Sequence, residues 1–140
     1  MIKQEFFNLE IKTNGQKLYE ITDKICNWIK KNNFNNGIIN LSIQHTSASL
    51  IVQENADIDV QTDLIHYFDK LVPMDNKLYT HITEGKDDMP AHIKSALTNN
   101  QISLSIQNKS LLLGTWQGLY LFEHRIEKQD RLIVLHFLGD

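Results

Sequence analysis

Alternation of apolar and polar residues in the last third of the chain is the feature that most limits its fold. Ile102, Leu104 and Ile106 alternate with polar residues, and a similar two-residue period returns in "GLYLFEHR" and "RLIVLHFLG". Successive side chains of a strand point to opposite faces, so this period predicts strands joined by short connections such as "EKQD". Strands that follow one another so closely pair antiparallel, which predicts a largely antiparallel sheet.

The first third of the chain mixes strand signals with a helix signal. Strands are predicted over residues 2–12, 38–45 and 49–55, which carry an apolar alternation or an apolar run. Between the first two, apolar residues recur at steps of three and four, the period of an amphipathic helix. This stripe predicts a helix of about 16 residues and consists of Leu18, Ile21, Ile25, Trp28 and Ile29.

Two further helices are predicted in the middle of the chain. One begins at Asp57, is ended by Pro73 and carries an apolar stripe of Val60, Leu64, Phe68 and Leu71. The other is short; Asp88 can cap it, Pro90 fits its first turn, and the side chains expected to face the core are Ile93, Ala96 and Leu97. Helices inserted among adjacent strands predict an α+β fold, with one compact domain over residues 1–140 and about three helices.

Composition argues against several classes of function. The formal net charge is -3 and the pI is near 6.0, so the chain lacks the basic excess by which proteins hold nucleic acid. Cys26 is the only cysteine, so no internal disulfide can form and any metal would need His, Asp or Glu ligands. No run of about 18 apolar residues occurs, and the N-terminus lacks a signal-peptide core. We therefore expect a cytoplasmic protein that contacts neither nucleic acid nor membrane.

Four of the six histidines are expected outside the interior of regular elements: His45, His81, His92 and His124. On a helix, residues four apart share a face, so Asp88 and His92 can point together at a ligand or a metal. The alternative is that Asp88 only caps the helix and His92 is a solvated surface residue.

Hydroxyl side chains follow His45 at the end of its strand. Thr46, Ser47 and their amides suit an anion if the chain turns there. The alternatives are a hydrogen-bonded core histidine and ordinary turn chemistry, because Ser and Thr bond their own backbone in loops. Around the start of the second helix lie Asn55, Asp57, Asp59 and Asp63, where acids complement the helix dipole. The alternative is that Asp59 and Asp63, one turn apart, turn a carboxylate face toward a metal or a cationic ring.

Polar groups also gather at the end of "GTWQGLYLFEHR". Alternation sends His124 to one face of that strand and Glu123 and Arg125 to the other. Arg125 could bind an anion there, and His124 could carry a proton or a metal; a solvated strand end is the alternative.

Three long segments, in this order, resemble the YjbQ-like family, also called the secondary thiamine-phosphate synthase family. They are "HTSASLIVQENADIDVQTDL", "HITEGKDDMPAHIKSAL" and "GTWQGLYLFEHR", and the resemblance covers almost the whole chain. It implies a compact α+β subunit, assembly as a homotrimer, and a polar pocket with histidines close to subunit contacts. It also implies a weak transferase activity in thiamine biosynthesis, which joins a pyrimidine pyrophosphate to a thiazole phosphate and releases pyrophosphate.

The resemblance also implies a set of site residues at matching positions. These are His45, Thr46, Ser47, Asn55, Asp63, His81, Glu84, Asp88, His92, Glu123, His124 and Arg125. Of these, the expected catalytic residues are His45, Asp88, His92, Glu123, His124 and Arg125. The expected substrate or anion ligands are Thr46, Ser47, Asn55, Asp63, His81, Glu84 and Arg125.

Our hypothesis is that His45, His92 and His124 converge on a divalent ion, either Zn or Mg, and that Asp88 or Glu123 orients one of the rings. Arg125 and the ion would then offset the charge of a phosphorylated metabolite. Two alternatives stay open: a metal-assisted phosphate-ester hydrolase, and a non-catalytic trimeric protein that binds metal or anions.

Overall fold

Eight strands and three α-helices make up the chain, and the computed structural model describes all residues from 1 to 140. The strands are β1 (Lys3–Asn14), β2 (Lys17–Glu20), β3 (Gly37–Ile43), β4 (Ala48–Glu54), β5 (Gln101–Gln107), β6 (Ser110–Leu111), β7 (Gln117–Glu123) and β8 (Lys128–Gly139). The helices are α1 (Thr22–Lys31), α2 (Ile58–Leu71), α3 (Asp88–Leu97) and the short 3-10 helix η1 (Asn76–Leu78). None of these helices has the length and apolar content that a membrane span requires.

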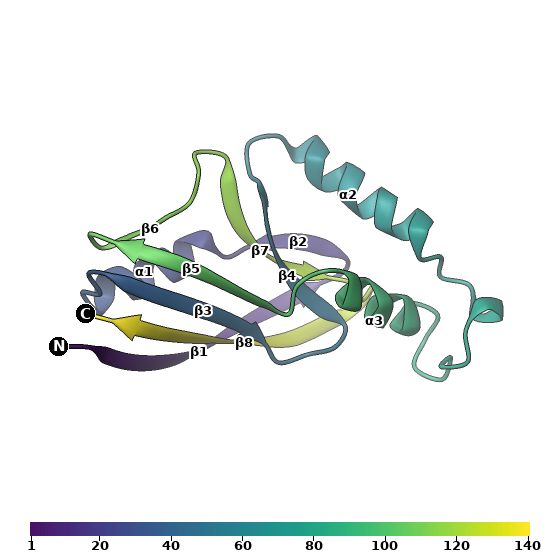
Figure 1. Ribbon diagram of the computed structural model, residues 1–140. Coiled ribbons are helices and arrows are strands. Elements are labelled where there is room, and N and C mark those ends of the chain that lie inside the picture. The colour runs from purple at the N-terminus through teal and green to yellow at the C-terminus, as the bar shows by residue number, and fades with distance from the viewer.

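The strands form two sheets, one in the order β1-β8-β3-β5-β6 and the other in the order β2-β7-β4. Neighbouring strands are antiparallel throughout both sheets, which confirms the predicted α+β domain with a largely antiparallel sheet. The long pair of β1 and β8 begins at Lys3 opposite Gly139, so the two termini lie at the same end of the molecule (Figure 1).

The core is built by the strand alternation and by one face of α1. A cluster of 18 buried apolar residues draws side chains from both sheets and from this helix. Ile39 and Leu41 of β3 are fully buried, whereas the neighbouring Ile38, on the opposite face of the strand, is exposed, as the two-residue period predicts. From α1 the cluster receives Ile25, Trp28 and Ile29.

The first predicted helix is shorter in the structure than its apolar stripe suggested. Leu18 belongs to strand β2, where it pairs with Phe122 of β7, and the helix starts only at Thr22. The three-residue step from Leu18 to Ile21 fits a helix by chance, because both residues are buried for different reasons. The prediction of a helix of about 16 residues was therefore wrong in its first turn.

The face that α3 buries also differs from the prediction. Ala91, Lys94 and Ser95 are buried, whereas Ala96 and Leu97 are exposed. The helix is drawn to β4 by a hydrogen bond, because Ser95 Oγ donates to the carbonyl oxygen of Ala48 at 2.9 Å. The buried face of α3 therefore combines polar side chains with Pro90 and Ala91.

Helix α2 lies on the outside of the molecule (Figure 1). None of its residues is fully buried, although Leu64, Ile65 and Phe68 pack against the small cluster of Leu18, Tyr120 and Phe122. Ile58, Tyr67 and Leu71 remain exposed. Beyond α2, the segment with η1 leads back to the start of α3, and it carries His81 on the way.

Candidate metal centre

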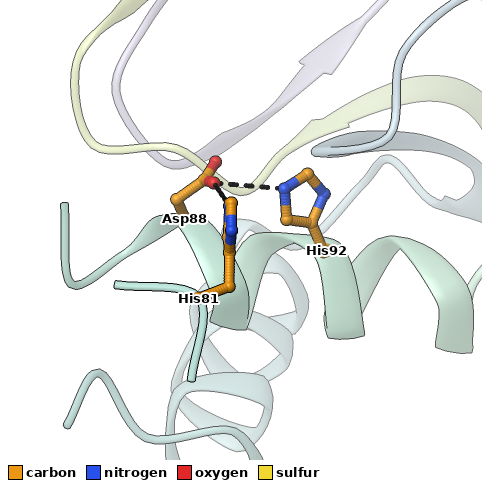
Figure 2. A group of neighbouring side chains, drawn as sticks. All are labelled: His81, Asp88 and His92. Atoms are coloured by element: carbon orange, nitrogen blue, oxygen red, sulfur yellow. Dashed lines mark hydrogen bonds and ion pairs between the residues drawn. The ribbon is translucent and has the colours of Figure 1, made fainter. Parts of the chain in front are cut away.

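Three side chains meet at the start of α3 (Figure 2). Asp88 and His92 lie one turn apart on the helix, and His81 comes from the segment that follows η1. Asp88 Oδ2 lies 2.7 Å from His81 Nε2 and 3.1 Å from His92 Nε2. One ligand atom from each residue lies within 4.8 Å of the other two. The four-residue spacing thus brings Asp88 and His92 together, and His81 joins them.

The alternative prediction from the sequence, that Asp88 caps the helix, was wrong. Asp87 occupies the N-cap position, and Asp88, in the first turn, is only 2% exposed. Its second oxygen, Oδ1, accepts a hydrogen bond from Arg125 Nη1 at 2.7 Å. Burial alone would raise the pKa of Asp88, but the hydrogen bond with His81 and the charges of His92 and Arg125 lower it. The carboxylate is therefore ionised at neutral pH.

The guanidinium of Arg125 forms its hydrogen bonds with groups of the protein itself. Besides Asp88 it binds Asp87, with Nε donating to Oδ2 at 2.9 Å, and Nη2 donates to the carbonyl oxygen of Glu84 at 2.9 Å. Gly85, at φ +105°, forms the turn between these partners. Arg125 thus fastens the segment that carries His81 to the start of α3. An anion would find little of this guanidinium free.

Hydrogen bonding fixes the tautomer of His92. Nδ1 lies 2.9 Å from the carbonyl oxygen of Thr46, and a carbonyl can only accept, so Nδ1 carries a proton. In the neutral ring, Nε2 then presents a lone pair to Asp88 Oδ2, 3.1 Å away. Two acceptors at this distance repel each other unless the ring is charged or a cation lies between them. A backbone carbonyl on the other ring nitrogen is also the usual support of a metal-binding histidine.

A divalent ion fits the residues of this cluster. With metal–ligand bonds of about 2.0–2.2 Å, neighbouring ligand atoms around one ion lie about 3.0–3.5 Å apart. The N–O separations of 2.7 and 3.1 Å are close to this range, and the ligand nitrogens of the two histidines lie within 4.8 Å of each other. Two imidazoles and one carboxylate suit Zn²⁺, and they suit Mg²⁺ poorly because Mg²⁺ prefers oxygen ligands. The residues that could hold a metal are therefore His81, Asp88 and His92.

The predicted set of His45, His92 and His124 does not converge. His45 Nε2 accepts a hydrogen bond from the backbone N–H of Leu132 at 2.8 Å, so that lone pair is already used. His124 is fully buried, and its Nε2 lies 2.9 Å from Ser49 Oγ. Burial, and then the charges of Lys94 and Arg131, lower the pKa of His124 to about 3. His124 thus belongs to the interior, and half-buried His45 bonds the backbone of β8 and lines a pocket beside His92.

Glu123 also lies away from the cluster, in the interior. It is fully buried and forms an ion pair with Arg131, whose Nε donates to Oε1 at 2.8 Å. Arg131 Nη2 also donates to Ser47 Oγ at 3.0 Å, and Thr13 Oγ1 donates to Glu123 at 2.6 Å. Sequence reasoning overlooked Arg131. The sequence pattern that could have indicated it is the two-residue period, which places Arg131 on the same buried face of β8 as Ile133 and Leu135.

The remaining predicted residues are placed as follows. Glu84 is mostly exposed and reaches His81, with 3.3 Å between Oε2 and Nε2. Thr46 is exposed at the mouth of the pocket described next. Asn55 and Asp63 lie exposed around the start of α2, and neither makes a side-chain hydrogen bond or ion pair with the cluster.

A pocket of about 330 Å³ adjoins His92. It is lined by seven residues, six of them polar: His45, Thr46, His92, Ser95, Ala96, Thr98 and Asn100. A larger hollow of about 490 Å³ lies among β1, β2 and the starts of α1 and α2, but it contains no histidine. We place the candidate site at the smaller pocket, because only there do polar groups converge beside a possible metal ligand.

Fold and site together define a class: a small α+β protein with two antiparallel sheets and a possible metal centre of two histidines and one aspartate. Within that class the chain belongs to the UPF0047 protein YjbQ-like family, whose model matches residues 7–140. A UPF0047 protein of Synechocystis is 47% identical over 132 residues, which cover 94% of this chain and 90% of the relative. YjbQ of Escherichia coli O157:H7 is 40% identical over 138 residues, covering 98% of each chain.

Solved structures agree with this assignment. A protein of the YjbQ/UPF0047 family from Clostridium acetobutylicum matches with a TM-score of 0.84 and 30% identity, over 94% of this chain and 98% of the other. A YbjQ-like protein of unknown function from Sulfolobus solfataricus matches with a TM-score of 0.90 over the whole of both chains. At 20% identity, the second likeness shows the fold alone.

Proposed function

We propose that this protein is a metal-dependent enzyme that acts on small phosphorylated metabolites. The observation that carries the proposal is the orientation of His92, whose Nδ1–H is held by the carbonyl of Thr46 so that Nε2, which has a lone pair in the neutral ring, faces Asp88. A divalent ion bound by His81, Asp88 and His92 would supply positive charge for phosphate oxygens.

The residues of the chain have distinct parts in this proposal. Arg125 keeps Asp88 in place through Oδ1, which leaves Oδ2 for the cluster. Because two carboxylates already neutralise Arg125, a phosphate would be held mainly at the metal centre. The adjoining pocket would bind the rest of the substrate and limit its motion, which replaces part of the entropy cost of bringing reactants together.

The named reaction that we propose is a thiamine-phosphate synthase-like condensation. A pyrimidine pyrophosphate and a thiazole phosphate would be joined, and pyrophosphate would be released. The support for it is the sequence resemblance of the three segments around His45, His81 and Arg125. The positive charge that this chemistry needs would come from a divalent ion held by His81, Asp88 and His92.

Phosphate-ester hydrolysis is the second candidate, and the size of the pocket favours it. About 330 Å³ is near the lower end of the range for small-molecule sites, so the pocket suits one small ester more than two ring systems. The same cluster would serve either reaction. We also propose that the subunits form a homotrimer in the cytoplasm; Tyr67 and Leu71, exposed and one turn apart on α2, support burial against another subunit.

The test starts from protein stripped with a chelator and titrated with Zn²⁺ in a calorimeter. We expect about one ion per chain for wild type and none for His92→Ala. Zn²⁺-loaded protein is then given the two thiamine precursors or a panel of phosphate esters, with His66→Ala, on the exposed face of α2, as the matched control. Turnover that survives in His92→Ala would come from a contaminant or another site. Zn²⁺ binding without any turnover would leave a binding protein, and sedimentation of monomers only would refute the homotrimer.

A further inference from the structure

The pocket beside His92 differs from the metal centre in its chemistry. It lies between the loop after β3 and the outer turns of α3, and none of its lining residues is Lys, Arg, Asp or Glu. Ala96 is its only apolar residue. A charged group would find no counter-charge there, and a large apolar group would find few apolar partners. The pocket therefore suits an uncharged, polar part of a ligand.

His45 offers this pocket a hydrogen-bond donor. Because its Nε2 accepts from the backbone N–H of Leu132 at 2.8 Å, the proton of the neutral ring lies on Nδ1. Nδ1 makes no hydrogen bond within the protein and is not a buried atom without a partner; the His45 ring lines this pocket and also a second hollow between β1 and β8. Gln44 N also donates to the carbonyl oxygen of Leu132 at 3.0 Å, which fixes the loop around the ring. Burial, and then the charge of Arg131, lower the pKa of His45 and keep the ring neutral.

Ser95 and Thr98 offer the opposite chemistry. Ser95 Oγ gives its proton to the carbonyl oxygen of Ala48 at 2.9 Å. Thr98 Oγ1 lies 2.6 Å from Ser49 Oγ and 2.9 Å from the carbonyl oxygen of Lys94, so its proton also stays within the protein. A hydroxyl group has one proton and two lone pairs, so both oxygens keep acceptor capacity. The residues that line the pocket thus include one histidine donor and two hydroxyl acceptors.

We propose that this pocket binds the organic part of a phosphorylated substrate, and that this part carries hydroxyl groups, as in a polyol or sugar phosphate. A hydroxyl both donates and accepts, so one such group can satisfy the Nδ1–H of His45 and a second can donate to Ser95 or Thr98. His45 is then a residue that determines specificity, with no part in metal binding. This inference rests on the second proposed function, phosphate-ester hydrolysis, since the metal centre must hold the phosphate and neither thiamine precursor carries a free hydroxyl group.

The experiment compares three probes on Zn²⁺-loaded protein by calorimetry: glycerol 3-phosphate, phenyl phosphate and inorganic phosphate. Wild type is expected to bind glycerol 3-phosphate more tightly than phenyl phosphate by about 5-fold or more, since each neutral hydrogen bond contributes about 2- to 10-fold. His45→Phe, which keeps a ring but loses the donor, is expected to lose most of this preference. His45→Gln is the matched control, because its amide can accept from Leu132 and still donate to the ligand. Both variants should bind Zn²⁺ as wild type does.

The outcomes separate the inference from the proposed function. If wild type binds no Zn²⁺, the proposed function fails and the inference fails with it. If Zn²⁺ binds but glycerol 3-phosphate and phenyl phosphate bind equally, only the inference is refuted. An undiminished preference in folded His45→Phe would refute the role of His45, and the comparison of probes on wild type remains decisive if that variant does not fold.

Discussion

His124 should make the folded protein sensitive to acid in a pH range where carboxylates do not yet titrate. Its ring is fully buried, it hydrogen-bonds Ser49, and its pKa is lowered from the ordinary 6.5 to about 3. Between pH 6.5 and pH 3 the ring is protonated in the unfolded chain but stays neutral in the folded chain, so stability falls as pH falls. Each pH unit below 6.5 costs about 1.4 kcal/mol, and at about pH 5 the loss is about 2 kcal/mol.

The measurement is the free energy of unfolding in urea at about pH 7.5 and about pH 5, with a chelator present so that metal binding does not contribute. His124→Gln keeps a side chain able to bond Ser49 but cannot titrate, so its loss of stability between the two pH values should be smaller by about 2 kcal/mol. His66→Gln, exposed on α2, is the control for losing an imidazole. Equal pH dependence of wild type and His124→Gln would mean that the buried ring is protonated in the folded state, and the reasoning would be refuted.

Two further predictions concern charged side chains that the fold holds in place. Arg125→Ala should weaken Zn²⁺ binding by about 10- to 100-fold, because Arg125 sets the orientation of Asp88. Added guanidinium should restore part of the Zn²⁺ affinity. Unchanged Zn²⁺ affinity with weaker phosphate binding would instead make Arg125 an anion ligand. Buried Lys94 and half-exposed Asp69 form an ion pair with 2.6 Å between Nζ and Oδ1. Asp69→Asn should lower the free energy of unfolding by about 3 kcal/mol or more, because it leaves the buried charge of Lys94 without a partner, whereas Lys94→Met should lower it less. Equal losses in denaturant titrations would contradict this.

Most of the sheet was predictable because a two-residue period has one structural cause. The alternations around Ile39, Leu104 and Leu121 became β3, β5 and β7, with their apolar faces toward the core. The helix signals were weaker. Leu18 was wrongly assigned to the stripe of α1, because local sequence carries no information about its strand partner. That partner, Phe122 on β7, is more than a hundred residues away.

Within the candidate site, local spacing predicted more than long-range convergence. Asp88 and His92 are neighbours because four residues make about one helical turn, and this holds wherever the helix packs. His81 joins them only through the segment that Arg125 fastens, so its place depends on the tertiary structure. His45 could not be assigned from sequence, since its role follows from a hydrogen bond with Leu132 on β8.

The run of Glu123, His124 and Arg125 shows how a buried charge can organise a site that it does not touch. The N–H groups of His124 and Arg125 both donate to Glu123 Oε2 at 3.1 Å, so the chain turns around this carboxylate at the end of β7.

That turn sends His124 inward and Arg125 out toward Asp88. Arg131, the partner of Glu123, also holds both oxygens of Ser47, next to the carbonyl of Thr46 that orients His92. A buried ion pair adds little net stability compared with an apolar pair. Here it fixes two supports of the candidate metal centre at once, one acting through Asp88 and the other through His92. This double role gives a physical reason to keep two charges in the interior.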